Sequence, residues 1–479
     1  MGGLTDRSST SGGLQSCLTN AVGGNHDLVA FPNKFLYQEE DVKPYNLDYE
    51  ITPAAVTYPE SADMVSAIVQ CAAQYDVKCQ ARSGGHSYAN YGLGGTDGAV
   101  VVDMKHFQQF SMDESTWIAT IGAGTLLHNI DTKLHAAGNR AIAHGTSPPI
   151  GVGGHATMGG LGPLSRQWGT TTDQVESMTV VLANGTQVNC SKEEHSDVFF
   201  AMRGAGASFG IVTEFRFNTH PEPTEMVSYA YNLTFGGPDL LAQTFKDWTA
   251  WITQANLTWK LASVCTILED GMIISGTFFG SQDEFSGLNI EVQLPNLPPV
   301  ELTLHDSYLG MLAHDAEELG LVLGSSIPAS FYSKSLTFTP QTYMTDEGID
   351  ALFEYLHKTH KGTIIWFVIF DLEGGYINTI PKDEAAYVLR DTQYFLQTYA
   401  VDIGPVSDTT HNFLQGVNDV IANYTPGVGG AYSGYVDRYL PNGQQEYWQS
   451  NLPRLEQIKK QIDPNDVFHN PQSVAPASD

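Results

Sequence analysis

The stretch "ARSGGHSYANYGLGG", residues 81–95, places His86 directly after two glycines and before a second glycine cluster. Upstream, Val77, Cys79 and Ala81 alternate with polar residues, a pattern that predicts a strand running into this loop. His86 is therefore expected on a loop at the carboxyl end of a strand, where ligands often bind. Glycines in such a loop let backbone N–H groups approach a large anionic ligand closely.

The surrounding segments predict a mixture of helices and strands. In "PESADMVSAIVQCAAQYDV", residues 59–77, Met64, Ile68 and Ala72 recur at helical spacing behind a Ser61 cap. We also expect strands over 98–104, 117–124 and 363–370 (the last fully buried), a helix over 125–138 that stops at Gly138, and a strand–turn–strand unit over 178–188 with Asn184-Gly185 at its turn. The predicted fold class is therefore α+β.

Two more glycine-rich loops follow, "HGTSPPIGVGGHATMGGLG" at residues 144–162 and "RGAGASFGIVTEF" at residues 203–215. Neither is a P-loop, because no GKS or GKT follows, and neither fits G-x-G-x-x-G opening a helix within a βαβ unit. Each loop taken alone could be an ordinary surface turn. In all three loops, glycine would let backbone N–H groups form a nest around an anion such as a pyrophosphate.

Length and composition predict a globular protein with two domains. The chain has 479 residues, of which 42% are hydrophobic and 16% charged, as in an ordinary globular protein. A chain of this length usually forms more than one hydrophobic core. A formal net charge of −30 would repel nucleic acid and anionic lipid, so neither a nucleic-acid partner nor a membrane partner is expected. The longest apolar run, residues 363–370, is too short to span a bilayer.

The composition changes past "NTHPEPTEM", residues 218–226, where the glycine clusters stop. Glycine, proline and aromatic residues return after about residue 425. We therefore expect one domain over 1–222, a second over 223–425, and a C-terminal segment over 426–479 that returns to the first domain.

The N-terminus "MGGLTDRSST" lacks the charged and apolar regions of a signal peptide, as a mature N-terminus would. Asn-x-Ser/Thr sequons nevertheless favour a secreted, extracellular glycoprotein. They lie at Asn184, Asn189, Asn232, Asn256 and Asn423.

Five cysteines are too few and too scattered for a disulfide scaffold or a zinc site, and no metal is expected. We expect one bridge, from Cys17 to either Cys71 or Cys79, with Cys190 and Cys265 free. The alternative is that all of the cysteines are buried free thiols.

Six motifs occur in order along the chain, within a resemblance that covers about residues 15–475: "RSGGHSYANYG", "GTSPPIGVGGHATMGGLG", "RGAGASFGIV", "FDLEGG", "AYSGYVDRYL" and "DPNDVFHNPQSV". Together they resemble the berberine bridge enzyme-like flavoproteins of the vanillyl-alcohol oxidase (p-cresol methylhydroxylase) superfamily, and among these the secreted gluco- and chitooligosaccharide oxidases. The resemblance implies a two-domain FAD-binding fold of the p-cresol methylhydroxylase type, with a substrate domain built on an antiparallel sheet.

The resemblance implies covalent FAD, because His86 matches the histidine that this family links to the flavin 8α-methyl group. Gly84 and Gly85 would let the main chain pass close to the pyrophosphate; a plain loop histidine is the alternative. Many relatives add a cysteine link in a G-T-C-P motif, but Ser147 stands there, so His86 is the only expected tether. The expected FAD-binding residues are Arg82, Ser83, Gly84, Gly85, His86, Ser87, Gly145, Thr146, Ser147, Ile150, Gly151, Gly154, His155, Gly159, Gly160, Gly210, Ile211, Val212, Asn470 and Gln472.

Two further matches concern the reactivity of the flavin. Ile150 matches the position beside the oxygen-reactive carbon, where isoleucine tends to block oxygen. It implies a dehydrogenase that uses a quinone or another acceptor, unless Ile150 is simply a core residue of its loop. His155 matches a histidine near N1 and C2=O, where a hydrogen-bond donor would stabilise the charge that develops on reduction; a structural histidine is the alternative.

Oxidation of a sugar at its anomeric carbon needs a base for the hydroxyl proton. The family uses a tyrosine in a Y-x-x-Y pattern and an aspartate at a strand end, which implies Tyr435 as the base and Asp371 as its partner. Because free tyrosine has a pKa near 10, the pair matters more than either residue. A buried core tyrosine is the alternative for Tyr435. Gly434 replaces an asparagine of the relatives, so one polar contact there is in doubt.

Residues expected to contact the donor are Tyr88, Gln397, Trp366, Glu373 and Tyr432. Tyr88 matches a ring that stacks on a sugar, and Gln397 matches a glutamine of the sugar site. Ile369 stands where the glucooligosaccharide oxidase pattern has a glutamine, so the exact sugar does not carry over.

The implied function is the oxidation of the C1 hydroxyl of cello-, chito- or related oligosaccharides to a lactone by a secreted, monomeric FAD enzyme. Within enzymes, the alternatives are an oxidase that uses O₂ and a berberine bridge-like oxidase of a secondary-metabolite alcohol. From a different class, the chain could be a catalytically silent flavoprotein; retention of both Asp371 and Tyr435 argues against that.

Overall fold

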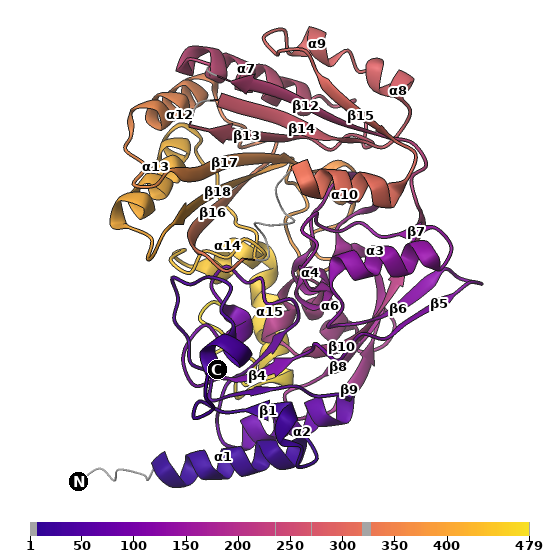
Figure 1. Cartoon of the computed structure of the whole chain (residues 1–479), viewed down its shortest axis with the longest axis vertical. Helices are drawn as coiled ribbons and strands as arrows, with labels where there is room; N and C mark the ends of the chain where they lie inside the picture. The colour runs from indigo at the N-terminus through magenta and orange to yellow at the C-terminus, as the bar shows by residue number, and fades with distance from the viewer. Residues whose placement is uncertain (1–6, 235, 270, 319–326, 479) are drawn as a thin grey trace.

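The computed structural model describes residues 7–234, 236–269, 271–318 and 327–478. The chain forms two halves stacked along its longest axis, with helix α1 (Arg7–Ala21) at one end (Figure 1). Residues 1–6, within the stretch "MGGLTDRSST", lie outside the described residues. Within the described ranges, no helix is both long and apolar enough to cross a lipid bilayer.

The half that carries the N-terminus contains two sheets that share one apolar core. In the first sheet, ordered β1-β2-β4-β3, strands β2, β4 and β3 are parallel. In the second, ordered β5-β6-β10-β8-β9, all pairs are antiparallel. The strands are β1 (Val29–Ala30), β2 (Ala55–Thr57), β3 (Cys79–Arg82), β4 (Val100–Asp103), β5 (Phe110–Asp113), β6 (Ile118–Gly122), β8 (Val175–Val181), β9 (Gln187–Cys190) and β10 (Ile211–Asn218), with a small ribbon of β7 (Arg140–Ala141) and β11 (His220–Pro221).

The predicted elements of this half are found with small shifts at their ends. Ser61 caps α2 by accepting a hydrogen bond from the Met64 N–H at 3.3 Å. Strand β3 begins at Cys79 rather than Val77, because the Val77 N–H still bonds to Ala72 at the end of α2. The helices are α2 (Ala62–Gln74), α3 (Leu127–Ala136), α4 (Val152–Met158), α5 (Ser165–Trp168) and α6 (Ser196–Ala205).

A disulfide joins Cys17 of α1 to Cys71 of α2, which decides between the two pairings left open by the sequence. Cys79, Cys190 and Cys265 are free and buried. The bridge spans 54 residues, and closing a loop of this length stabilises a fold by about 4 kcal/mol. The bridge therefore ties the N-terminal helix α1 to α2.

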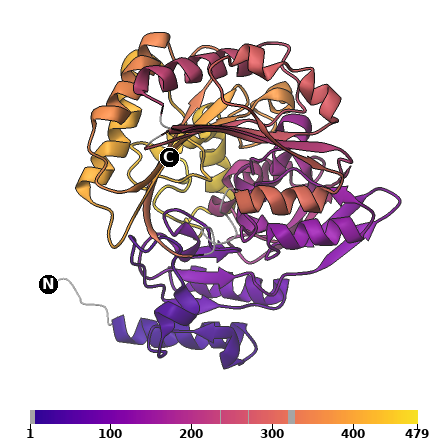
Figure 2. The same ribbon diagram turned by 45° about the horizontal axis from the view of Figure 1, so that its top comes forward.

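The other half is a seven-stranded antiparallel sheet ordered β15-β12-β14-β13-β17-β18-β16, which confirms the predicted antiparallel architecture. Figure 2 shows helices on its outer side and the first half on its inner side. The strands are β12 (Met226–Thr234), β13 (Val264–Leu268), β14 (Gly271–Phe278), β15 (Glu301–His305), β16 (Ser330–Phe338), β17 (Ile365–Leu372) and β18 (Tyr394–Asp402); the helices are α7 (Pro238–Ile252), α8 (Gln282–Ser286), α9 (Ile290–Gln293), α10 (Tyr308–Glu318), α12 (Asp346–Lys358) and α13 (Asp408–Tyr424).

Strand β17 differs from the fully buried strand that its apolar run predicts. Trp366, Val368 and Phe370 are buried against the layer of outer helices. The intervening Phe367 and Ile369 point to the other face and stay partly exposed. The run is continuous because both faces of this strand are apolar, although only one of them belongs to the core.

Residues 373–390 cross from the second half back to the first, so the expected domain over 223–425 is interrupted. The short helix η6 (Gly375–Thr379) packs against α5. Arg390 then forms a bidentate ion pair with Asp173, with N–O distances of 2.7 and 2.8 Å. Arg390 is only 1% exposed, and a buried pair of this geometry holds its two segments in a fixed orientation.

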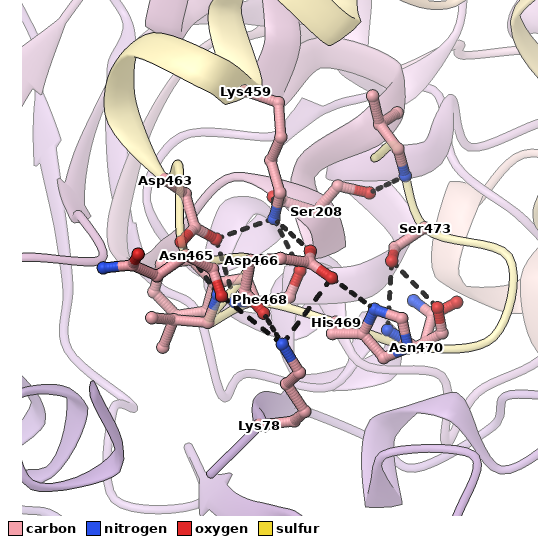
Figure 3. Close-up of polar contacts among 12 residues, drawn as sticks. Lys78, Ser208, Lys459, Asp463, Asn465, Asp466, Phe468, His469, Asn470 and Ser473 are labelled. Carbon is pink, nitrogen blue, oxygen red and sulfur yellow. Dashed lines mark hydrogen bonds and ion pairs between the residues drawn. The ribbon is translucent and has the colours of Figure 1, made fainter. Parts of the chain in front are cut away.

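The C-terminal segment returns to the first half through α14 (Gly443–Trp448) and α15 (Leu452–Ile462). Phe468 forms an isolated parallel bridge with Cys79 beside β3. Lys459 fastens this return, because its Nζ donates to the carbonyl oxygens of Ser208 and Phe468 at 2.7 and 2.8 Å and pairs with Asp463 at 2.7 Å (Figure 3). Both charged side chains are fully buried.

We expect Lys459→Met to lower the free energy of unfolding by about 3 to 5 kcal/mol, because the buried Asp463 carboxylate would lose its cation. The matched control is Lys358→Met, which breaks an exposed ion pair with Glu354 and should cost less than about 1 kcal/mol. Urea unfolding of both variants measures the difference. Equal losses in the two variants would contradict the role assigned to Lys459.

Candidate functional site

A cavity of about 1200 Å³ lies between the two halves, lined by the three glycine-rich loops and by the inner face of the seven-stranded sheet. It is larger than most small-ligand pockets, so it has room for a dinucleotide and a second molecule. The expected site residues that line it are Arg82, Ser83, Gly84, Gly85, His86, Ser87, Tyr88, Gly145, Thr146, Ser147, Ile150, Gly151, Gly154, His155, Gly210, Val212, Asp371, Gln397, Tyr432 and Tyr435.

The first two glycine-rich loops are pressed together at Gly84 and Gly151. A Cβ on Gly84 would lie 2.3 Å from the Gly151 nitrogen, and a Cβ on Gly151 would lie 2.1 Å from the Gly84 nitrogen. We expected Gly84 to be glycine so that the chain could approach a pyrophosphate. In the structure, the contact that excludes a side chain there is with the neighbouring loop.

His86 projects into the cavity from the first loop, directly after Gly85, whose φ of +77° lies in the left-handed region. The Tyr45 ring packs on the imidazole with 4.5 Å between centroids. Burial lowers the pKa of His86 to about 4, so the ring is neutral near pH 7. A neutral imidazole keeps a nitrogen lone pair and can act as a nucleophile.

His155 lies on α4, which starts at the second glycine-rich loop. Its Nε2 accepts a hydrogen bond from the Gly145 N–H at 2.9 Å, so the ring proton is assigned to Nδ1. Burial, and then the neighbouring His144, lower the pKa of His155 to about 3. His155 is therefore a neutral hydrogen-bond donor rather than a cation.

The residues present fit FAD. A Cβ on Gly154 would meet no atom within 4 Å, which leaves open space over the start of α4. The buried Ser147 hydroxyl has no hydrogen-bond partner within the protein, as expected of a group that faces a ligand. The third loop adds Gly206, Ala207 and Gly210, which have little or no side chain. These features match a dinucleotide held through backbone groups.

Tyr435 and Asp371 face the same cavity from different segments of the chain. Burial, and then the nearby Asp371 carboxylate, raise the pKa of Tyr435 well above its usual value. Burial raises the pKa of Asp371 to about 7. Their side chains form no direct hydrogen bond with each other, but the phenol and a carboxylate that ionises near neutrality are placed close together.

Aromatic rings surround Tyr435. Tyr88 stacks on it at 6.1 Å, and the Tyr88 hydroxyl accepts a hydrogen bond from Gln397 Nε2 at 3.0 Å. Phe331 and Tyr399 pack edge-on against Tyr88 and stack on each other at 4.8 Å. Tyr88 and Gln397 are therefore brought together with the tyrosine–aspartate pair, as the sequence predicted.

Trp366 and Glu373 do not line the cavity, contrary to our expectation. Trp366 points to the outer face of β17, where its Nε1 donates to Glu269 at 2.8 Å and its ring packs on Phe413. Glu373 is buried beyond the end of β17, and Arg166 donates to its backbone carbonyl. Burial, and then the Asp371 charge, raise the pKa of Glu373 well above its usual value.

Several expected FAD-binding residues lie next to the cavity rather than in its lining. The Gly160 N–H donates to the Tyr432 hydroxyl at 2.8 Å, and Gln472 Nε2 donates to the Asp437 carbonyl at 2.8 Å. The Asn470 side chain accepts from the Gln472 N–H, within its own turn. In the structure they brace segments that do line the cavity; the complete set is Gly159, Gly160, Ile211, Asn470 and Gln472.

Sequence reasoning missed Tyr45, Phe331 and Tyr399. Tyr399 follows Gln397 by two residues in β18, so strand alternation could have placed it on the same face. Phe331 pairs with β18 through β16, which no local pattern predicts. Tyr45 lies in a segment without a motif and reaches His86 only through the fold.

Family models match two parts of the chain. Residues 53–191 match the family described as FAD binding domain, and residues 431–475 match the family described as berberine and berberine like. The FAD-linked oxidoreductase sorD of Penicillium rubens is 38% identical, over 97% of this chain and 98% of its own length.

Two solved structures have the same fold, each with a TM-score of 0.88. One is the xylooligosaccharide oxidase of Myceliophthora thermophila C1 in complex with xylobiose, 31% identical, covering 98% of this chain and all of its own. The other is the glucooligosaccharide oxidase of Acremonium strictum with 6-S-cysteinyl, 8α-N1-histidyl FAD, 30% identical with the same coverage.

Proposed function

The chain belongs to the berberine bridge enzyme-like FAD-linked oxidoreductases, and from this premise we propose that it oxidises a hydroxyl-bearing carbon of an organic donor. The observation that carries the proposal is the presence of His86, His155, Tyr435 and Asp371 on one cavity. Bound FAD would supply the acceptor for the hydride. The residues of this chain would hold that cofactor, orient the donor and take up the hydroxyl proton.

Tyr435 would take the proton from the donor hydroxyl, and Asp371 would receive or polarise the proton of Tyr435. The raised pKa of Tyr435 means that its phenol is protonated at neutral pH. It can act as a base only if its own proton leaves at the same time. Asp371 is the nearby group suited to this, because its pKa of about 7 lets it be ionised at working pH.

His86 would be the only covalent tether of FAD. Its neutral imidazole reaches the cavity, whereas Ser147 offers a hydroxyl in place of a thiol. The Ser147 hydroxyl cannot form the 6-S-cysteinyl link to FAD that is described for glucooligosaccharide oxidase. His155 would donate from Nδ1 to negative charge that develops on the ring.

Two donors are proposed. The first is the reducing end of an oligosaccharide, supported by the oligosaccharide oxidases among the relatives and by the Tyr88–Gln397 pair. The second is a less polar secondary-metabolite alcohol, favoured by Phe367 and Ile369 on the cavity wall. For the electron acceptor we propose a quinone-type molecule, because Ile150 lines the cavity where a smaller residue would leave room for oxygen.

We also propose that the protein is a secreted, glycosylated monomer. Asn184, Asn189, Asn256 and Asn423 are exposed, as glycan acceptors must be. Asn232 is a poorer acceptor, because it lines the cavity and donates a hydrogen bond to Glu301 at 3.0 Å.

The tether is tested by acid denaturation of the purified holoprotein. We expect nearly all of the yellow chromophore to stay with the precipitated wild-type chain and nearly all of it to be released from His86→Ala. Ser147→Ala is the control and should retain the chromophore as the wild type does. Release from the wild type would refute the covalent link, and release from Ser147→Ala would show that His86 is not sufficient.

The proton pathway is tested by the pH dependence of flavin reduction under anaerobic conditions. Asp371 accepts a proton only when ionised, so the rate should rise as the pH passes through about 7. Asp371→Asn should slow reduction by about 100-fold or more and flatten this rise, and Tyr435→Phe should be similarly slow. The surface variant Asp391→Asn should behave as the wild type. The same rise in Asp371→Asn would assign the titration to another group.

The choice of acceptor is tested by timing the reoxidation of the reduced enzyme. The wild type should react faster with a benzoquinone than with O₂, and Ile150→Val should react with O₂ about tenfold faster, because a methylene beside the ring is removed. Ile51→Val is the control, since Ile51 is buried in the core of the first half. Fast reaction of the wild type with O₂ would make the protein an oxidase.

A further inference from the structure

The inner face of the seven-stranded sheet forms the wall of the cavity beyond Tyr435. Because side chains alternate along a strand, Asp371, Ile369, Phe367 and Ile365 of β17 all face this wall. Their order matters: the carboxyl group stands at one end, and three apolar side chains follow it along the strand. At about 3.3 Å per residue, this row extends for roughly 20 Å.

The neighbouring strands add both polar and apolar side chains to this wall. In β18, Gln397 pairs with Ile369, Tyr399 pairs with Phe367, and Val401 pairs with Ile365. On the other side of β17, Thr266 of β13 pairs with Ile369 and with Ile273 of β14. Among the described residues of β13, β14, β17 and β18 that face the cavity, the polar groups larger than a hydroxyl lie near Asp371.

The polar end of the wall holds Asp371, Gln397 and the Tyr435 hydroxyl. Gln397 Nε2 is already bonded to the Tyr88 hydroxyl. Tyr88, Phe331 and Tyr399 present ring surfaces around it. Tyr435 and Asp371 can hold one hydroxyl-bearing group here. Next to the apolar row of β17, the adjacent strands β13 and β18 present the hydroxyls of Thr266 and Tyr399, whereas the amide and carboxylate groups of Asn232 and Glu301 line the cavity from the more distant strands β12 and β15.

A second and third sugar unit would lie against Phe367 and Ile365, where the Tyr399 hydroxyl could bond to one hydroxyl group and the others would lose water without gaining hydrogen bonds. An apolar group placed there would gain from leaving water. The Ile365 side chain is 45% exposed. Single exposed apolar side chains are common on protein surfaces, but Ile365 continues a row of apolar neighbours.

We propose that the donor is an elongated molecule with a hydroxyl-bearing carbon at one end and an apolar body that lies along β17, rather than an unsubstituted oligosaccharide. This inference rests on the proposed function and selects between its two donors. In the reaction, the carbinol C–H bond would break with its electron pair, for which bound FAD would be the acceptor, and the O–H proton would pass to Tyr435 as the proton of Tyr435 passes to Asp371. A primary alcohol thereby becomes an aldehyde.

The test uses the holoenzyme under anaerobic conditions and two independent signals. Binding is followed by the change in flavin absorbance, and reaction by flavin bleaching. The probes are 4-alkylbenzyl alcohols of increasing chain length, with cellobiose and xylobiose for comparison. We expect Kd to fall about threefold for each added methylene until the wall is covered, and the disaccharides to bind without saturation in the same range.

Ile369→Gln should weaken binding of the long-chain probes about tenfold, because a buried amide is left unpaired against an apolar chain. Ile403→Gln is the matched control, since Ile403 is fully exposed, and should leave Kd unchanged. Saturable binding of cellobiose or xylobiose, together with no dependence on alkyl chain length, would overturn the inference.

Binding and bleaching separate the two proposals. If disaccharides bind and bleach the flavin, the donor inference fails while the proposed oxidation of a hydroxyl-bearing carbon stands. If the alkyl series binds with the expected chain-length dependence but bleaches the flavin at no pH, the proposed function fails while the apolar character of the donor site stands.

Discussion

The architecture of the site depends on one backbone contact, between Gly84 and Gly151. Because either loop would clash with a Cβ on the other at about 2 Å, the two loops are locked together without intervening side chains. His86 and α4, with His155, are thereby fixed on the same side of the cavity. The reactive groups are positioned by main-chain packing, which is more rigid than long side chains on separate loops.

The two halves of the molecule divide the work, and the tyrosine–aspartate pair lies where they meet. Asp371 comes from β17, whereas Tyr435 comes from the segment that returns to the first half. Their separation is therefore set by contacts between the halves. The buried Arg390–Asp173 pair is one of these contacts, and it lies close in sequence to the strand that carries Asp371.

Much of the fold and of the cofactor side of the site could be predicted, because short motifs and glycine spacing report on local backbone geometry. Donor-side predictions were weaker. Trp366 was placed beside Asp371 in the cavity, although an odd spacing on a strand puts two residues on opposite faces. Glu373 was misplaced because β17 ends before it. Tyr45 and Phe331 reach the site through long-range packing, which no local pattern encodes.

The path of the C-terminal segment has a consequence for biosynthesis. Phe468 lies beside β3 and lines the cavity, and Lys459 anchors the last helix through a charge that is wholly shielded from solvent. These residues are synthesised long after the three glycine-rich loops, so the cavity walls are complete only once the segment that carries Phe468 has left the ribosome. A nascent chain that stops short of Phe468 would carry the glycine-rich loops but no finished binding site, so FAD can be bound only after this segment has emerged.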